Sequence, residues 1–262
     1  MKDRRGFWNS YGTSSDNAWY LDAVVAEHKQ RSHLMMLRRW MGDVPPCRIL
    51  KTDLFEESHK TDQILIDSFF SPHQITAFDL AFSTVKKARE NYPAVGGGFW
   101  TGDVCQLGLA TESMDFILSI STLDHFKNSS DFYKSIEELI RVIRPGGALI
   151  LTLDNPQNPL YWTLRVASRL GLSPYPLGFS VSLKNLTKIL REKGLEVLET
   201  DLLIHNPRGI STALFMAVRR IMRNHADGIL RWFLNRFDLL GRLPSRTWTA
   251  CFIAVYARKA IR

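Results

Sequence analysis

Polar side chains that could bind a ligand follow two apolar runs in the middle of the chain, residues 99–101 and 116–120. Apolar runs of this length, bounded by turn residues, are typical of buried strands. In an open α/β sheet, ligands bind in a crevice at the carboxyl ends of the strands. We therefore expect such a crevice where these two runs end. The side chains expected to line it are those of Asp103, Ser119, Ser121, Asp124 and His125.

His125 and its neighbour Asp124 are the side chains of this stretch that could move a proton. A general base helps wherever a hydroxyl group is the nucleophile, and His125 is the best-placed candidate just beyond the second run. The alternative is a structural role, in which His125 packs against or caps the helix that follows. The other histidines show no paired spacing of the kind that binds zinc, so we expect no metal site.

The elements that must position these residues alternate between strands and helices, which indicates βαβ units and a parallel sheet. The predicted strands are residues 47–50, 75–78, 99–101, 116–120, 148–153, 195–204 and 247–257. The predicted helices that connect them are residues 61–70, 83–91, 129–144, 161–170 and 183–193. The expected fold is α/β, a Rossmann-like, seven-stranded, mostly parallel sheet with helices on both faces.

Three segments, taken in their order and spacing, resemble the class I S-adenosylmethionine-dependent methyltransferases of the broad type-11 kind. They are residues 75–80 (ITAFDL), residues 102–107 (GDVCQL), and residues 113–126 followed by RPGG at 144–147. The resemblance implies S-adenosylmethionine as cofactor. It also implies that Asp79, with Leu80 beside it, binds the two ribose hydroxyls, and that Asp103, between Gly102 and Val104, meets the adenine amino group. A carboxylate at a strand end can accept hydrogen bonds from two neighbouring hydroxyls.

The first strand departs from the family pattern, which runs acid, hydrophobe and then three alternating glycines. No glycine occurs between Gly42 and Gly96. One alignment puts Lys51 at the acid position and Asp53 at the first glycine. The other makes Asp53 the acid and puts residues 55–57 where the family has glycines. The side chains of these three residues would narrow the pocket. We favour the second, in which Asp53 pairs with the cofactor's ammonium group and Lys51 or Thr52 lies nearby.

The missing glycines leave two functions open. The first is a methyltransferase that acts on a small-molecule, lipid or lipid-linked glycan acceptor. The alternative is a catalytically inactive, methyltransferase-like binding protein. The absence of a phosphate-binding glycine fingerprint argues against a nicotinamide-dependent oxidoreductase.

The net charge of +8 is concentrated in one part of the chain. Residues 208–246 hold eight arginines and two aspartates, whereas residues 52–207 hold 14 basic and 19 acidic residues. The basic segment predicts two amphipathic helices, at 210–223 and 229–240, which could rest on an anionic membrane face or form a solvated surface. Because no basic and aromatic strand platform accompanies them, we do not expect nucleic acid as a partner.

We expect a helical lead or lid at residues 1–45, with helices at 17–29 and 31–41, and a methyltransferase-like domain at 46–262. Within that domain, residues 155–180 form a substrate-side segment and residues 208–246 a basic helical insertion before the last strand. The aromatic lead (Phe7, Trp8, Tyr11, Trp19 and Tyr20) packs on the domain or covers a ligand. Three widely spaced cysteines, with no signal peptide and no membrane-spanning run, predict a cytoplasmic protein that contacts a membrane peripherally at most.

Overall fold

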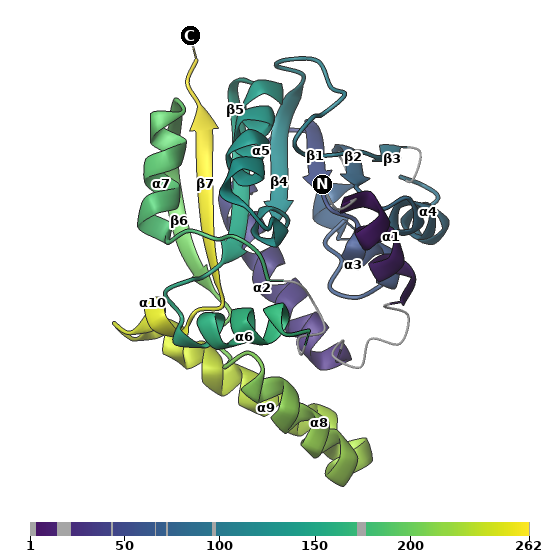
Figure 1. The fold of residues 1–262 in the computed structure, drawn as a ribbon, viewed down its shortest axis with the longest axis vertical. Coiled ribbons are helices and arrows are strands. Elements are labelled where there is room, and N and C mark those ends of the chain that lie inside the picture. The colour runs from purple at the N-terminus through teal and green to yellow at the C-terminus, as the bar shows by residue number, and fades with distance from the viewer. Residues whose placement is uncertain are drawn as a thin grey trace.

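The computed structural model describes residues 4–14, 22–42, 44–65, 67–71, 73–95, 98–171 and 177–261. Its centre is a seven-stranded sheet with the order β3-β2-β1-β4-β5-β7-β6, which confirms the predicted fold class (Figure 1). Strands β1 to β5 pair in parallel, and β7 lies antiparallel between β5 and β6. The strands are β1 (Arg48–Thr52), β2 (Gln74–Asp79), β3 (Phe99–Thr101), β4 (Met114–Ile120), β5 (Ile143–Asp154), β6 (Leu195–Leu203) and β7 (Phe252–Lys259).

Helices cover both faces of the sheet, with α5 and α7 in front and α2 behind in Figure 1. The helices are α1 (Arg4–Ser14), α2 (Ala23–Met41), α3 (Phe55–His59), α4 (Phe82–Asn91), α5 (Ser129–Val142), α6 (Pro159–Arg169), α7 (Leu183–Glu192), α8 (Ile210–Met222), α9 (Ala226–Asp238) and α10 (Arg246–Thr249). Short 3-10 helices occupy Ser68–Phe70, Leu123–His125, Arg223–His225 and Leu239–Arg242.

Alternation along the strands divides the core into two layers. Ile49 of β1 packs in the layer with α2 and α4, and the next residue, Leu50, packs in the layer with α5 and α7. In α5, Phe132, Ile136 and Leu139 recur at helical spacing and are fully buried, as the sequence period predicts. Because both faces of the sheet are covered, polar groups gather where the strands end.

Predicted and observed elements differ in the first βαβ unit and in the helices that precede it. Instead of a helix over 61–70, the chain forms α3 directly after β1 and only a short 3-10 helix at Ser68–Phe70. The N-terminal part also differs, because α1 was not expected and one helix, Ala23–Met41, replaces the predicted pair. Asp22 caps that helix through Val24 N and Val25 N, and the predicted start at 17–21 lies outside the described residues.

The last predicted strand, 247–257, begins later than expected because Arg246–Thr249 forms the short helix α10. The carbonyl groups of Thr247 and Ala250 accept hydrogen bonds from the side-chain amide of Asn155, at 2.7 and 3.0 Å. These carbonyls are therefore satisfied by a side chain and not by a strand ladder. The alternating sequence of this segment resembles a strand, but its backbone partners are those of a turn of helix.

Helices α8, α9 and α10 form the insertion between β6 and β7, at the lower end of the molecule in Figure 1. Arg219 of α8 donates to the Asp22 carboxylate at 2.7 and 3.1 Å, and Arg231 of α9 pairs with Glu27 at 2.7 Å. Within the described part of the chain, no helix combines the length and hydropathy that crossing a bilayer requires.

Candidate functional site

The carboxyl ends of β1, β2, β4 and β5 meet at one edge of the sheet. Thr52, the last residue of β1, is in register with Phe78 on one side and with Ser119 on the other, and Ile120 is in register with Thr152. The residues that follow these positions carry most of the predicted site. The structure therefore brings Asp53, Asp79, Ser121 and Asp124 to the same edge.

Asp79 ends β2 and links two neighbouring turns at this edge. One carboxylate oxygen accepts from Ala81 N at 2.7 Å and the other from Leu54 N at 3.1 Å, which leaves lone pairs on both oxygens. Burial raises the pKa of Asp79, although these two N–H donors oppose the shift. Leu80 follows it as a half-buried residue at the start of the loop to α4.

Asp103 lies beyond β3 and is held from two directions. Its Oδ1 accepts from Cys105 N at 2.9 Å, and its Oδ2 forms an ion pair with Arg4 of α1. Gly102 precedes it against an aromatic pair, because a Cβ there would lie 3.0 Å from the Trp100 ring nitrogen and 3.4 Å from the Phe78 ring. Val104, on the other side of Asp103, is buried.

Helix α1 lies across this edge of the sheet through three kinds of contact. Arg4 also pairs with Asp131 at 3.2 Å. The Trp8 ring meets the His125 ring edge-on, with centroids 5.4 Å apart. Asn9 accepts from Ser83 through both its side chain and its carbonyl group. The helix thus contacts Asp103, the predicted adenine-binding acid, and His125, the predicted base. Of the predicted aromatic lead, Trp19, Tyr20 and the side chain of Tyr11 lie outside the described part of the chain.

Thr52, Ser119 and Ser121 occupy different environments. Thr52 and Ser119 are fully buried, and the Thr52 hydroxyl donates to the Ser119 hydroxyl at 3.0 Å. Ser121 has a left-handed backbone with φ of 48°, and its N–H donates to the Thr152 hydroxyl at 3.0 Å. The buried Ser121 hydroxyl has no hydrogen-bond partner among the described residues. Of the two serines, Ser121 is the one with unused hydrogen-bonding capacity.

The turn after β1 has a backbone of the kind that glycine normally provides. Asp53 has a φ of 75°, in the left-handed region that residues with a Cβ rarely adopt. Its N–H donates to Phe78 O at 2.8 Å, and its Oδ1 accepts from Phe55 N at 2.6 Å. This left-handed backbone is the one expected at the first glycine of the alignment with Lys51 at the acid position, and the Asp53 carboxylate still lies at the sheet edge, as the alternative alignment requires.

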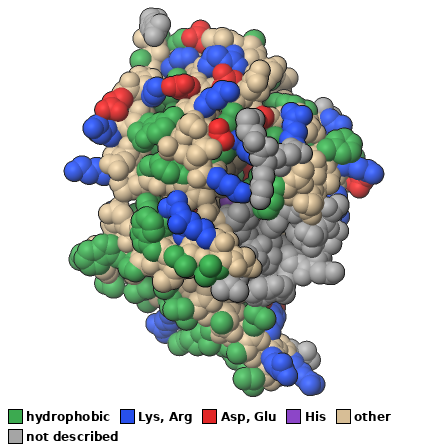
Figure 2. All heavy atoms as spheres, in the orientation of Figure 1, with side chains coloured by type: hydrophobic (Ala, Val, Ile, Leu, Met, Phe, Trp, Pro, Cys, Tyr) green, Lys and Arg blue, Asp and Glu red, His purple; other side chains and the backbone are tan. Residues whose placement is uncertain are grey.

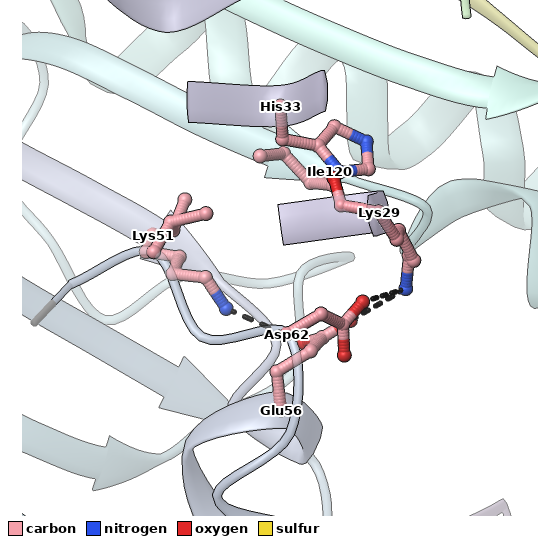
Figure 3. A pocket seen from close by; sticks show the side chains of 7 residues that line it. Lys29, His33, Lys51, Glu56, Asp62 and Ile120 are labelled. Carbon is pink, nitrogen blue, oxygen red and sulfur yellow. Dashed lines mark hydrogen bonds and ion pairs between the residues drawn. The ribbon is translucent and has the colours of Figure 1, made fainter. Parts of the chain in front are cut away.

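Beneath this turn lies a buried network of opposite charges (Figure 3). Lys51 donates to Glu57 at 2.8 Å, and Lys29 of α2 pairs with Asp62 at 2.5 Å and with Glu56 at 3.2 Å. The side chains of Glu56 and Glu57 therefore turn towards the two lysines. A small cavity here is lined by Lys29, Lys51, Glu56, Asp62 and His33, among others.

The charges of this network decide its protonation. Burial alone would lower the pKa of Lys51, but the attraction of Glu57 and Glu56 outweighs it, so the pKa is raised. Burial lowers the pKa of His33 to about 3 and keeps the imidazole neutral. Sequence reasoning missed Lys29, because an isolated lysine on a predicted surface helix carries no signal of a partner elsewhere in the chain.

A second charged group lies at the ends of β4 and β5. Asp124 is buried, its Oδ2 accepts from Asp154 N at 2.6 Å, and its Oδ1 has no partner among the described residues. Burial, followed by the neighbouring charge of Asp154, raises the pKa of Asp124 to about 6. Arg208 from the start of the insertion forms an ion pair with Asp154 and lies over the Phe252 ring at 4.9 Å. Asp154 and Arg208 were not predicted as site residues.

A small cavity lies next to this charged group. It lies between α6 and the segment before α8, and its lining includes Asn155, Tyr161, Leu164 and Arg208. Tyr161 donates from its hydroxyl to Gly178 O at 3.0 Å. The predicted substrate-side segment and the basic insertion therefore both contribute side chains next to Asp154.

Comparison with known proteins identifies the type of domain. A family model described as a methyltransferase domain matches residues 61–151. A phthiotriol/phenolphthiotriol dimycocerosates methyltransferase from Mycobacterium ulcerans is 26% identical over 142 residues, which cover 53% of this chain and 50% of that protein. The chain spans about half the length of the curated relatives that it matches.

Solved structures share the fold at low identity. A possible histamine N-methyltransferase from Thermotoga maritima has a TM-score of 0.56 and 16% identity, and the match covers 97% of both chains. A geranyl diphosphate C-methyltransferase from Streptomyces coelicolor, solved with S-adenosyl-L-homocysteine, has a TM-score of 0.57 and 8% identity, covering 88% of this chain and 79% of that one.

Proposed function

We propose that this chain, which belongs to the class I S-adenosylmethionine-dependent methyltransferases, transfers a methyl group to a hydroxyl of a lipid or other small molecule. The observation that carries the proposal is the set of carboxylates at one sheet edge, where Asp79 and Asp103 stand at the strand ends that hold the cofactor in this family. When bound, S-adenosylmethionine supplies an activated methyl group on a sulfonium centre.

The residues of the adenosine end fit that cofactor. Asp79 keeps lone pairs on both carboxylate oxygens after its two backbone hydrogen bonds, as two neighbouring hydroxyls require. Asp103 can accept from an amino group once Arg4 moves aside, because its other oxygen is already used by Cys105 N. Gly102 keeps the approach to the Trp100 ring free of a side chain.

The turn after β1, where we expect the methionine part of the cofactor to bind, carries charged residues in place of the family's glycines. Burial, and then the negative charges of Glu56 and Asp79, raise the pKa of Asp53. A bound ammonium group beside Asp53 would relieve that repulsion, so we expect Asp53 to pair with it. The carboxylates in and beside the network outnumber its two lysines, so the lysines do not neutralise them all. The lysines are Lys29 and Lys51, and the carboxylates are those of Glu56, Glu57, Asp62, Asp53 and Asp79.

Asp124 and His125 are the candidate proton acceptors. A general base works best when its pKa lies near the working pH, and the pKa of about 6 of Asp124 meets that condition. The free Oδ1 of Asp124 is the atom that would receive the proton of an acceptor hydroxyl. His125, held by the Trp8 ring, would orient the acceptor or share this role. In this proposal α1 acts as a lid that excludes water from the edge.

The acceptor class is proposed from two independent indications. The Mycobacterium ulcerans relative is named for dimycocerosate acceptors, which are lipids. The cavity beside Asp154 is lined by Leu160, Leu164 and Leu177, and its polar side chains include Arg208, Asn155, Asn158 and Tyr161. A lipid with one polar, hydroxyl-bearing end matches these side chains in chemistry, and the small cavity would have to widen to admit it.

Thermal unfolding with S-adenosylhomocysteine tests the cofactor assignment. A ligand at 100 times its dissociation constant adds about 2.7 kcal/mol to the free energy of unfolding. We expect this stabilisation in the parent chain and its loss in Asp79→Asn, with Glu192→Gln on the exposed face of α7 as the matched control. No stabilisation of the parent at millimolar ligand would contradict cofactor binding and favour an inactive binding protein.

Transfer itself is tested with tritiated S-adenosylmethionine and a total lipid extract from the source cells. Label in the organic phase that disappears in Asp124→Ala supports the proposal. Label that stays in the aqueous phase with a small polar acceptor would contradict the lipid part of it. Cofactor binding without transfer to either fraction would contradict the catalytic part.

A further inference from the structure

Helix α8 is apolar on the face that it exposes. It packs on the molecule through Phe215 and Ser211, which are buried. A second set of apolar side chains, at positions i, i+4, i+7 and i+11, lies on the exposed side: Ile210, Leu214, Ala217 and Ile221. Ile221 is 75% exposed and Ile210 is 60% exposed. A surface helix normally carries polar residues there, so this face indicates an interaction.

Helix α6 adds a second exposed apolar row next to α8. Trp162 and Val166 of α6 and Leu170, the residue that follows its end, are four residues apart and are exposed by 55%, 55% and 67%. The two helices are neighbours, because a Cβ on Gly209, just before α8, would lie 3.0 Å from the Leu164 side chain of α6. Figure 2 shows hydrophobic side chains over the lower end of the molecule, where α6, α8 and α9 lie in Figure 1.

The charge around this surface is positive. Arg219 and Arg231 are neutralised by carboxylates, as the ion pairs with Asp22, Asp227 and Glu27 show. By contrast, Arg220, Arg223 and Arg242 are exposed and form no ion pair with any residue that the structure describes. Each arginine near an anionic bilayer surface contributes about 1 kcal/mol to binding, which is about fivefold in affinity.

We propose that the exposed rows of α6 and α8 rest on a bilayer leaflet that contains anionic lipids, with Arg220 and Arg223 on the headgroups. An apolar face bordered by arginines matches the chemistry of an interfacial helix. A soluble protein partner would need carboxylates to meet the same arginines, and the apolar rows alone do not select one. The charge and the apolar rows together favour the lipid surface.

This placement connects the membrane to the candidate active site. The cavity lined by Leu164 of α6 and by Arg208 lies beside the apolar rows, and Arg208 pairs with Asp154, whose N–H donates to Asp124. In this placement a lipid acceptor would leave the leaflet between α6 and α8 and meet the pair of Arg208 and Asp154, which lies next to Asp124. This step extends the proposed function, whereas vesicle binding itself does not depend on methyl transfer.

Sedimentation with vesicles tests the proposal on the full chain. Phosphatidylcholine vesicles that contain phosphatidylglycerol should bind the parent, and pure phosphatidylcholine vesicles should bind it much less. Arg220→Gln/Arg223→Gln should lower the partition constant about 25-fold, at about fivefold for each arginine. The matched control, Lys184→Gln/Arg191→Gln on exposed positions of α7, should leave it unchanged.

The apolar rows are tested with Leu214→Gln/Ile221→Gln, which should lower the partition constant at least about tenfold. Met35→Gln, at a position on α2 that is 66% exposed, is the matched control. Urea unfolding and S-adenosylhomocysteine binding of each variant, measured without vesicles, show that the fold and the cofactor site are intact.

Equal binding to both kinds of vesicle, no binding to either, or parent-like binding of both double variants would overturn the proposal. A concentration-dependent dimer that Leu214→Gln/Ile221→Gln dissociates, without a change in vesicle binding, would overturn it in favour of a second copy. Loss of cofactor binding with intact vesicle binding would overturn only the proposed function.

Discussion

Lys51→Met breaks the most deeply buried ion pair of the candidate site. The Lys51 side chain is 3% exposed, the Glu57 side chain is 0% exposed, and their charged atoms are 2.8 Å apart. Methionine fills a similar volume but leaves the Glu57 carboxylate without an ion-pair partner among the described residues, where its second oxygen already has no hydrogen-bond partner. We expect the free energy of unfolding to fall by about 3–5 kcal/mol at pH 7, the usual cost of removing one partner of a buried pair.

The pH dependence of this loss follows from Glu57. Burial, partly opposed by Lys51, already raises the pKa of that carboxyl above its usual value, and removing Lys51 raises it further. A folded-state pKa above the unfolded one means that protonation stabilises the fold. The difference in unfolding free energy between variant and parent should therefore shrink as the pH falls from 7 towards 4.

Urea titrations at pH 7 and pH 5, followed by circular dichroism, measure both effects. Lys188→Met is the control, because Lys188 is 73% exposed and its pair with Glu192 is a surface pair worth well under about 1 kcal/mol. Lys51→Met/Glu57→Gln removes both charges and should recover much of the loss. A loss below about 1 kcal/mol in Lys51→Met, or a double variant as unstable as the single one, would refute the buried network.

Two further predictions concern the lid and the candidate base. Arg4→Gln frees Asp103 from a half-exposed ion pair, so S-adenosylhomocysteine should bind up to about fivefold more tightly, as measured by calorimetry. Unchanged or weaker binding would exclude competition between α1 and the ligand. Because burial and Asp154 raise the pKa of Asp124 to about 6, its protonated form stabilises the fold, and this contribution is lost as the pH rises from about 4 to 6. In the parent, the free energy of unfolding should therefore decline by about 3 kcal/mol over this pH range, and Asp124→Asn should remove that decline. A pH dependence identical to the parent's would contradict the raised pKa.

Much of the sheet is predictable from the sequence, because its strands are nearly continuous apolar runs. β3 has the predicted bounds, and Asp79 and Asp103 lie at strand ends as expected. The helix capped by Ser182 also begins where predicted, with the Ser182 hydroxyl accepting from Asn185 N. Local signals of this kind, hydrophobic period and capping, depend on residues that are neighbours in the chain.

The rebuilt first turn is not predictable from the same signals. Lys51 is a charged residue inside a strand, and its burial is explained only by the carboxylates of Glu57 and Glu56, which α3 places next to it. The ion pair between Arg4 and Asp103 likewise joins residues about a hundred positions apart. The left-handed backbone of Asp53 is not predictable from its residue type, because an aspartate, unlike a glycine, does not indicate this conformation.

The insertion begins and ends at neighbouring points of one hairpin, since Leu203 of β6 is in register with Phe252 of β7. The free energy of closing a loop grows only with the logarithm of its length, by about 0.6 kcal/mol for each doubling. The sheet therefore places little constraint on how many residues α8, α9 and α10 contain. Replacing this insertion by another, while keeping Arg208 as its contact with the strand ends, could change the acceptor and leave Asp79 and Asp103 in place.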